Sequence, residues 1–187
     1  MSKKPELYNL TEITDRLRDS ATCRSTFNEV IKIFSEPLYW QIRKIVINHD
    51  DTNDLLQNTF LKAWSSIENF RGDAKLSTWL HKIAINESIT FINKQKAKLQ
   101  IPLDESNEFL LDNIQGSEWF DGDEIQLKLQ QAISRLPEKQ RLVFNMRYFD
   151  EMKYEEISEI LSTSEGALKA SYHHAVKKIE DFFFNND

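Results

Sequence analysis

A short acidic segment divides the chain and limits what the parts on either side of it can fold into. Residues 101–125 contain eight Asp or Glu residues and no Lys or Arg, although the formal net charge of all 187 residues is only −6. The segment also holds glycine and proline, and its apolar residues follow no sustained period. We therefore predict two small domains, residues 1–98 and 125–187, joined by an acidic linker over residues 99–124.

Both flanking parts carry apolar residues at helical spacing. In the first part, Phe27, Val30, Ile31 and Phe34 recur at intervals of three and four residues. Only four Gly and four Pro occur in the chain, and no stretch of useful length alternates apolar and polar residues as a half-buried strand does. The fold class is therefore predicted to be all-α, with four helices in the second domain.

The sequence also predicts where several helices begin and end. Thr11 is expected to cap a first short helix that ends at Asp19. Pro37 is expected to interrupt the second helical pattern, because proline lacks the N–H that a helix interior requires. Asp51 or Thr52 is expected to cap the next helix.

Two short helical patterns near the C-terminus are separated by a polar turn, as in a helix-turn-helix. They cover residues 154–161 and 168–179, with residues 162–166 between them. At about 100° per residue, Leu168 shares one face of the second helix with Ala175. Tyr172 and Ile179 lie on that same face, which is therefore predicted to be buried. Spacing alone is equally compatible with an αα-hairpin inside a helical bundle.

The sequence argues against several other classes of protein. Its one cysteine, Cys23, cannot form an internal disulfide and is typical of a reducing compartment. No segment has the length for membrane insertion and the N-terminus has no apolar signal core, so we expect a cytoplasmic protein. No motif of an enzyme or of a cofactor site occurs. His173 and His174 point about 100° apart on a helix and are not expected to bind a metal together.

Two blocks of the sequence resemble the ECF-type (extracytoplasmic-function) sigma factors of bacterial RNA polymerase. They read FLKAWSSIENFRGDAKLSTWLHKIAINESITFI and AISRLPEKQRLVFNMRYFDEMKYEEISEILSTSEGALKASYHHAVKKI. Their order and separation match that family, and together they are more specific than a helix-turn-helix alone. The resemblance implies a promoter-specificity subunit that binds core polymerase, recognises the −10 and −35 promoter elements and directs transcription initiation.

The segment DDTNDLLQNTFLKAW resembles the family helix that docks on the clamp coiled coil of the polymerase β′ subunit. The residues that the resemblance assigns to polymerase binding are Asp54, Leu55, Gln57 and Asn58. The apolar pattern predicts that Leu56, Phe60 and Trp64 face inward. Leu55 is then expected to be the exposed apolar residue that the polymerase buries, whereas an ordinary solvated helix face is the alternative.

The segment NFRGDAKLSTWLHKIAIN resembles the part of the family that recognises and opens the −10 element. Gly72 permits a tight loop for an extruded base, whose capture offsets an unstacking cost of roughly a few kcal/mol. Trp79 is expected to pack in the core. The residues expected to contact −10 DNA are Arg71, Gly72, Asp73, Ala74, Lys75, Ser77, Lys82, Asn86 and Lys94.

Residues 164–178 resemble the helix that reads the −35 element, and Ser164 is expected to cap the N-terminus of that helix. The residues expected to contact −35 DNA are Ser164, Gly166, Lys169, Ala170, Ser171, His173, His174 and Lys177. The sequence departs from the family pattern at Ser162, where Gly is usual, and at His174 and Val176, where arginines are usual. We therefore expect either an unusual −35 sequence or weak −35 binding by this domain.

The resemblance also implies protein partners. These are core RNA polymerase, through its β′ clamp coiled coil and its β subunit, and an anti-sigma factor. Two weak DNA-binding modules on one linker gain effective concentration when both are engaged, so an acidic chain suits this role. The free chain is expected to be a monomer whose domains pack together loosely, with Trp119 and Phe120 between them. The alternative is a stand-alone dimeric helix-turn-helix regulator, in which the first block has no role.

Overall fold

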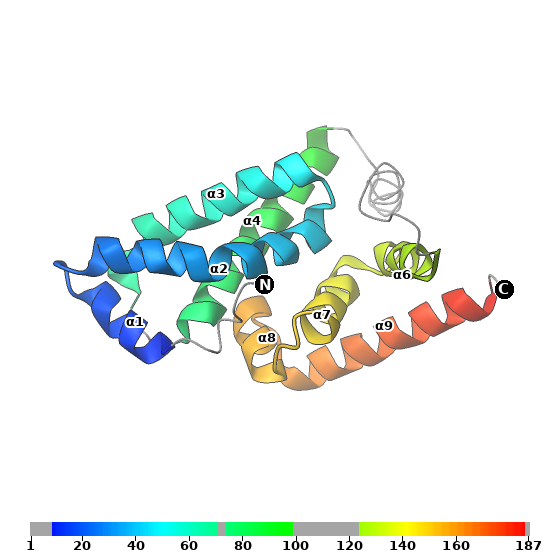
Figure 1. Cartoon of the computed structure of the whole chain (residues 1–187). Helices are drawn as coiled ribbons and strands as arrows, with labels where there is room; N and C mark the ends of the chain where they lie inside the picture. Colours follow the sequence, from blue (N-terminus) through cyan, green and yellow to red (C-terminus); the bar gives the residue numbers. More distant parts are fainter. Residues whose placement is uncertain (1–8, 71–73, 99–123, 186–187) are drawn as a thin grey trace.

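The computed structural model describes residues 9–70, 74–98 and 124–185, and the regular elements in these ranges are helical, as predicted (Figure 1). The N-terminal half contains α1 (Leu10–Arg18), α2 (Cys23–Val46), α3 (His49–Ser65), the 3-10 turn η2 (Ile67–Asn69) and α4 (Leu76–Lys98). The C-terminal half contains α6 (Glu124–Ser134), α7 (Glu138–Tyr148), α8 (Tyr154–Leu161) and α9 (Glu165–Asn185). The linker residues Trp119 and Phe120 lie outside the described residues.

Asparagine side chains cap the helices for which other caps were expected. The Asn9 side chain accepts a hydrogen bond from the backbone N–H of Glu12, so α1 begins before Thr11. Asn48 accepts from the backbone N–H of Asp51 at 3.0 Å, so α3 begins earlier than the Asp51 or Thr52 cap predicted. Both predictions were wrong because a suitable cap stood two or three residues upstream and gave each helix an earlier start.

Pro37 does not interrupt α2, contrary to the sequence prediction. The helix runs without a break from Cys23 to Val46 with Pro37 in its interior. A proline at such a position costs about 3 kcal/mol. Fully buried apolar residues on both sides of it, including Phe34, Leu38 and Ile42, offset this cost through their packing.

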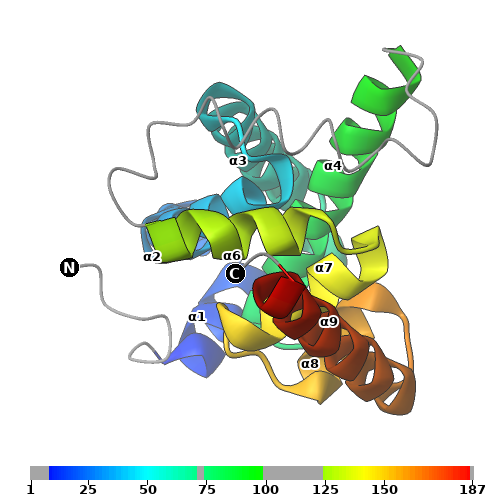
Figure 2. The same ribbon diagram turned by 90° about the vertical axis from the view of Figure 1, so that its right-hand side faces the viewer.

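The C-terminal half has a small core of its own, between α6, α7 and the distal part of α9 (Figure 2). Its buried residues are Ala132, Ile133, Leu136, Phe144, Ala175 and Ile179. The buried guanidinium of Arg141 on α7 donates to the backbone carbonyl oxygen of Leu136 at 3.2 Å. This contact satisfies a carbonyl just after the end of α6 and fixes that helix on α7.

The two halves pack directly against each other. Helix α8 lies against α4, and α7 lies against α2. We call this contact between α7–α8 and α2–α4 the seam. The larger hydrophobic core crosses it, because Val143, Met146 and Ile157 of the C-terminal half join a cluster that also contains Leu38 and Leu80 of the N-terminal half. The expected packing of the halves is therefore present, and it is closer than a loose association.

None of the helices in the described parts of the chain combines the length and the apolar character needed to cross a membrane.

Candidate nucleic-acid interface

Helix α3 presents a polar outer face with an apolar end. Asp54, Gln57 and Asn58 are exposed, as predicted, and Leu61 continues the same stripe with 62% of its surface exposed. These positions are spaced three and four residues apart, so they lie one above another on the helix.

Leu55 does not belong to this face, although the sequence predicted that it was exposed. Its side chain is only 5% exposed and belongs to the core. Helix α3 packs against both α2 and α4, so its buried arc is wide enough to include Leu55 together with Phe60 and Ala63. The most exposed large apolar residue of this helix is Leu61, which was not predicted because the buried side of the helix is wider than its apolar spacing indicates.

Trp64, at the end of the same helix, is neither fully buried nor fully exposed. Its ring centroid lies 5.0 Å from that of Phe27, yet 41% of the residue remains exposed. The prediction that it faces inward was therefore only half correct. Leu61 and Trp64 together give the outer side of α3 an apolar end beside its polar stripe.

Helix α4 presents a polar face that contains part of the predicted −10 set. Lys82, Asn86 and Lys94 are exposed, and the first two lie close to one line along the helix. Ser77 points to the other side and is partly buried, and Ala74 is partly buried in the turn before the helix. Arg71, Gly72 and Asp73 lie outside the described residues. Trp79 packs against Phe70, with ring centroids 4.8 Å apart, as its predicted core position requires.

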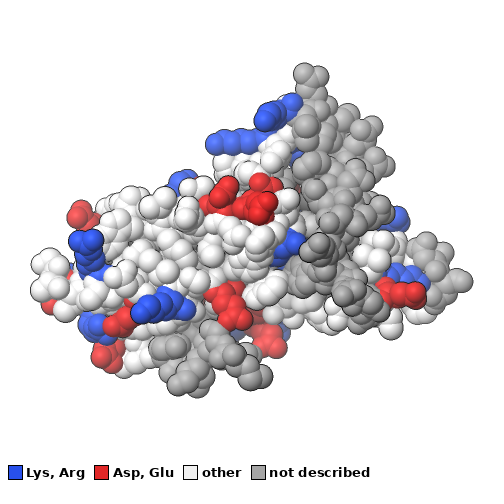
Figure 3. All heavy atoms as spheres, turned by 45° about the horizontal axis from the view of Figure 1, so that its top comes forward, with Lys and Arg blue, Asp and Glu red and all other residues white. Residues whose placement is uncertain are grey.

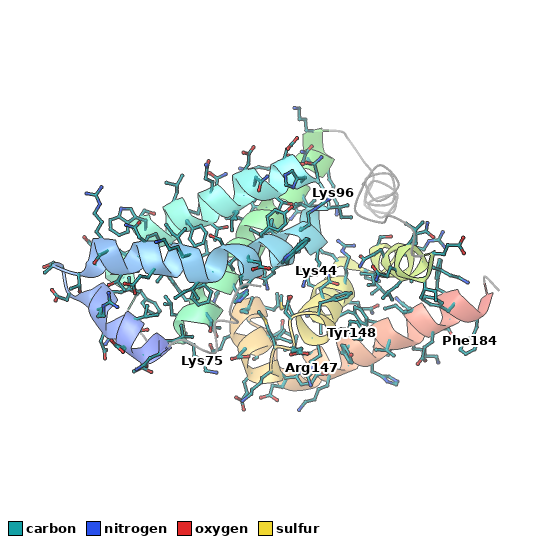
Figure 4. All side chains as sticks on the ribbon, viewed as in Figure 1. Lys44, Lys75, Lys96, Arg147, Tyr148 and Phe184 are labelled. Atoms are coloured by element: carbon teal, nitrogen blue, oxygen red, sulfur yellow. The ribbon has the colours of Figure 1, made fainter. Side chains whose placement is uncertain are left out.

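Lys75, just before α4, is exposed but already has a partner. Its Nζ lies 2.8 Å from Oε1 of Glu156 on α8 (Figure 4). The hydrogen bond to Glu156 and that residue's negative charge raise the pKa of Lys75. A residue expected at the −10 surface is thus ion-paired to the helix-turn-helix.

The helix-turn-helix has the predicted geometry. Helix α8 spans the predicted residues, and α9 starts three residues before the predicted Leu168 and continues beyond Ile179. Ser162 ends α8 in the left-handed conformation, with φ 49° and ψ 45°. Glycine adopts this conformation without penalty, whereas serine pays roughly 1–2 kcal/mol. The turn therefore holds a conformation that favours glycine, although serine stands at this position.

The first turn of α9 is capped by Ser164, as predicted. Its Oγ accepts a hydrogen bond from the backbone N–H of Ala167 at 3.4 Å. Gly166 lies exposed in this turn, and a Cβ there would meet nothing within 4 Å. The start of the helix is accordingly open to a close approach from outside.

The predicted reading face of α9 faces solvent. Leu168, Ala175 and Ile179 are buried and Tyr172 is partly buried, so the opposite face carries the exposed residues. Those exposed residues are Gly166, Lys169, Ala170, His173, His174 and Lys177, while Ser171 is partly buried at the flank.

Two features of this face bear on what it binds. The Nζ of Lys169 lies 3.2 Å from Glu165 and 5.5 Å from the ring centroid of Tyr154, which holds the ammonium near the start of α9. The His173 and His174 rings lie 6.0 Å apart between centroids, and no group of three or more metal-binding side chains gathers anywhere in the described chain.

Charges of both signs are interspersed over the face of the molecule that Figure 3 draws. On the face drawn in Figure 3, the described Lys and Arg side chains stand among Asp and Glu and do not merge into a broad basic field. Such a surface provides little of the bulk electrostatic attraction that supports strong DNA binding by a protein alone.

Comparison with known proteins identifies relatives of both halves. Family models for sigma-70 region 2 and sigma-70 region 4 match residues 31–98 and 126–179. The RNA polymerase sigma factor SigV of Bacillus subtilis is 34% identical over 71% of this chain and 75% of its own length. The ECF RNA polymerase sigma factor SigW of the same organism is 27% identical over 80% of this chain and 84% of its own.

Solved structures show the same fold. CnrH, in complex with the cytosolic domain of CnrY, matches 95% of this chain and 99% of its own with a TM-score of 0.71 at 16% identity. The sigma factor RpoE of Bartonella quintana, in complex with the anti-sigma factor NepR, matches 84% of this chain and 96% of its own, with a TM-score of 0.65 at 19% identity.

Proposed function

The chain belongs to the ECF sigma factors of bacterial RNA polymerase, and from that premise we propose how its surfaces share the work of starting transcription. As a sigma factor it is a promoter-recognising subunit, a class of transcription factor that acts without catalysis of its own. The observation that carries the proposal is that two sigma-type regions occur in order, and that the second presents a capped recognition helix with a solvent-facing polar side.

We assign core polymerase binding to the outer side of α3. Asp54, Gln57 and Asn58 supply polar contacts there, and Leu61 supplies the apolar anchor in place of Leu55. A partner that covers this exposed leucine removes its apolar surface from water, which favours binding. The partner surface is the clamp coiled coil of the β′ subunit.

The −10 element is assigned to α4 and to the loop before it. Lys82 and Lys94 track backbone phosphates, and Asn86 on the same side supplies hydrogen bonds to bases. Residues 71–77, including Arg71, hold the extruded base of the opened strand. Melting is then driven by binding, because the captured base offsets the lost stacking.

The −35 element is assigned to the first turns of α9 in the major groove. Ser164 and the open backbone N–H groups of that turn bind phosphate, and Gly166 permits close approach. Ala170 contacts a thymine methyl group, and Lys169 and Lys177 contact guanine or phosphate. No arginine stands on this face of α9, so the domain binds DNA weakly unless the polymerase and the −10 contacts hold it in place.

An anti-sigma factor is proposed as the regulatory partner. Two structural relatives support this proposal. The sigma factor of Bartonella quintana was solved in complex with the anti-sigma factor NepR, and CnrH was solved in complex with the cytosolic domain of CnrY. We place the chain in the cytoplasm with the polymerase, as a monomer when free. Co-purification of the chain from its own organism without crosslinking, followed by mass spectrometry, tests for such a partner.

Transcription with purified components tests the proposed function. The protein is mixed with sigma-free core polymerase from its own organism and genomic DNA, and the 5′ ends of the transcripts are sequenced. We expect discrete start sites that share an element near −10 and another near −35. Asn86→Ala should weaken the preference for the shared −10 element among the promoters used. Lys169→Ala should weaken the preference for the shared −35 element.

Two outcomes would contradict the proposal. Specific duplex binding by the protein alone, on a palindromic site and without specific transcript starts, would identify a stand-alone dimeric regulator. Asn86→Ala and the surface control Glu180→Gln could also change transcription equally at all promoters. That result would show that Asn86 on α4 does not recognise the −10 element. Glu180 lies exposed in the distal half of α9 and is not among the residues assigned to DNA binding.

A further inference from the structure

We propose that Glu165 and Lys169 together read one base pair of the −35 element, and that Tyr154 of α8 positions the lysine for this contact. The pair selects a base pair in which guanine or thymine, the two bases with a carbonyl oxygen in the major groove, faces Lys169. We call these the keto bases, and cytosine and adenine the amino bases. The inference rests on the proposed function, because it names the base preference of the recognition helix assigned there.

Glu165 and Lys169 form an ion pair on the exposed side of the first turns of α9. The Nζ of Lys169 lies 3.2 Å from Oε2 of Glu165, and the two side chains are 59% and 44% exposed. They stand four residues apart, so they lie one above the other along the helix. Beside them Gly166 and Ala170 are exposed and small, and a Cβ on Gly166 would meet nothing within 4 Å. A duplex that approaches this turn therefore meets the ion pair unshielded.

Tyr154 fixes the lysine end of the pair. The Nζ of Lys169 lies 5.5 Å from the centroid of the Tyr154 ring, which is within the range of a cation–π contact. The ring is partly buried against the larger core, and the guanidinium of Arg147 lies 5.3 Å from the same centroid. An ammonium group on a flexible four-carbon chain is thus held at one place. A fixed position suits a base contact, because contacts to phosphate carry no sequence information.

The two charged groups have opposite hydrogen-bonding characters. An ammonium group only donates, and an ionised carboxylate only accepts. In the major groove, guanine presents the acceptor O6 beside the amino donor N4 of its cytosine, and thymine presents the acceptor O4 beside the amino donor N6 of its adenine. Lys169 therefore matches the keto base, and Glu165 matches the amino group of the base paired with it.

The spacing of the ion pair also matches that of a base pair. The carbonyl oxygen and the amino nitrogen of one base pair are joined by a hydrogen bond of about 2.9 Å. Nζ of Lys169 and Oε2 of Glu165 are 3.2 Å apart, so both can contact one base pair without separating from each other. In the reversed base pair the ammonium meets an amino group and the carboxylate meets a carbonyl oxygen, and both contacts become repulsive.

The ammonium group also distinguishes the two keto bases. Guanine offers N7 as a second acceptor beside O6, whereas thymine offers a methyl group beside O4. Lys169 has three N–H donors and uses two of them on guanine. The preferred base opposite Lys169 is therefore guanine, followed by thymine, with both amino bases disfavoured.

Transcription from a promoter library tests the inference with the full chain. The protein is combined with sigma-free core polymerase from its own organism, and each template carries one fixed −10 element, a randomised −35 region and a transcribed barcode. Sequencing of the transcripts ranks the four bases at each −35 position. For the wild type we expect one position at which the keto bases are preferred over the amino bases by about tenfold.

The main variant exchanges the two charges, as Glu165→Lys with Lys169→Glu. We expect its preference at that position to invert, from the keto bases to the amino bases, because donor and acceptor change places. The matched control exchanges the exposed ion pair between Asp15 and Arg18 on α1, as Asp15→Arg with Arg18→Asp, and should leave every base preference unchanged.

The failure of this inference is distinguishable from that of the proposed function. A wild type with clear −35 preferences, none of which inverts in the exchange variant, would overturn this inference and leave −35 recognition by α9 in place. A wild type that uses all −35 sequences equally would contradict −35 recognition itself, and this inference with it.

Milder substitutions keep the test informative if the exchange variant does not fold. Glu165→Gln replaces a group that only accepts by an amide that both donates and accepts, so the discrimination should fall by about fivefold. Tyr154→Leu removes the ring and should weaken the same preference without inverting it, whereas Tyr154→Phe keeps the ring and should retain the preference. Undiminished discrimination in both Glu165→Gln and Tyr154→Leu would show that the pair is an ordinary surface ion pair.

Discussion

Protonation of His81 should account for a large part of the change in the free energy of unfolding with pH. This residue on α4 faces Gln41 and Lys44 of α2 and Glu156 of α8. Its Nδ1 lies 2.7 Å from Oε1 of Gln41, an oxygen that only accepts hydrogen bonds, so Nδ1 carries the hydrogen of a neutral ring. Burial, and secondarily the positive charge of Lys44, lower the pKa of His81 from 6.5 to about 4, against a smaller opposing effect of Glu156.

The size of the effect follows from these two values. Because the pKa is lower in the folded chain, the contribution of neutral His81 to stability is complete above pH 6.5 and is lost as the pH falls toward 4. Between about pH 7.5 and pH 5.5, the unfolded chain takes up nearly a full proton at this position and the folded chain takes up almost none. The free energy of unfolding should therefore fall by about 1.4 kcal/mol.

Urea unfolding at the two pH values measures this difference. The His81→Gln variant keeps a hydrogen-bond donor for Gln41 and cannot titrate, so its stability should lose about 1.4 kcal/mol less than that of the wild type over the same range. The double variant His173→Gln, His174→Gln is the control, because both of these rings are exposed. Equal pH dependence in the wild type and in His81→Gln would refute the reasoning.

Other substitutions test other parts of the structure. Leu61→Ser should weaken binding to core polymerase in a pull-down assay without lowering the melting temperature, whereas Leu55→Ala should lower the free energy of unfolding by about 2–5 kcal/mol, as a buried leucine does. Removal of the buried guanidinium in Arg141→Ala should cost about 2 kcal/mol in chemical denaturation, since it leaves the carbonyl of Leu136 without its donor. Ser164→Ala should cost about 1 kcal/mol of stability and weaken binding to −35 duplex measured by fluorescence anisotropy, and full affinity in this variant would show that the cap plays no part in DNA binding.

The sequence predicted the helix-turn-helix well because the information there is local. Helix α8 and the buried face of α9 follow from apolar spacing within a few residues of each position. Ser164 was recognisable as a cap from its place before that spacing begins. Such features need no knowledge of distant parts of the chain.

The errors arose where distant packing decides the outcome. Leu55 is buried because α3 has neighbours on two sides, and Pro37 is tolerated because the residues around it are in the core. The pairing of Lys75 with Glu156 joins residues 81 positions apart. Neither periodicity nor family resemblance contains these contacts, so only the folded chain reveals that part of the predicted DNA-binding set is occupied.

The length of α9 makes it a lever. Its 21 residues form a rod of about 32 Å. One face of its first turns is exposed while Leu168 packs beside α8, and its distal part packs against α6 and α7. A tilt of about 10° about the distal end would move the first turn by about 5 Å, more than the 3.4 Å step between neighbouring base pairs. The firmness with which α6, α7 and α8 hold the helix therefore sets how accurately its first turn is positioned on DNA.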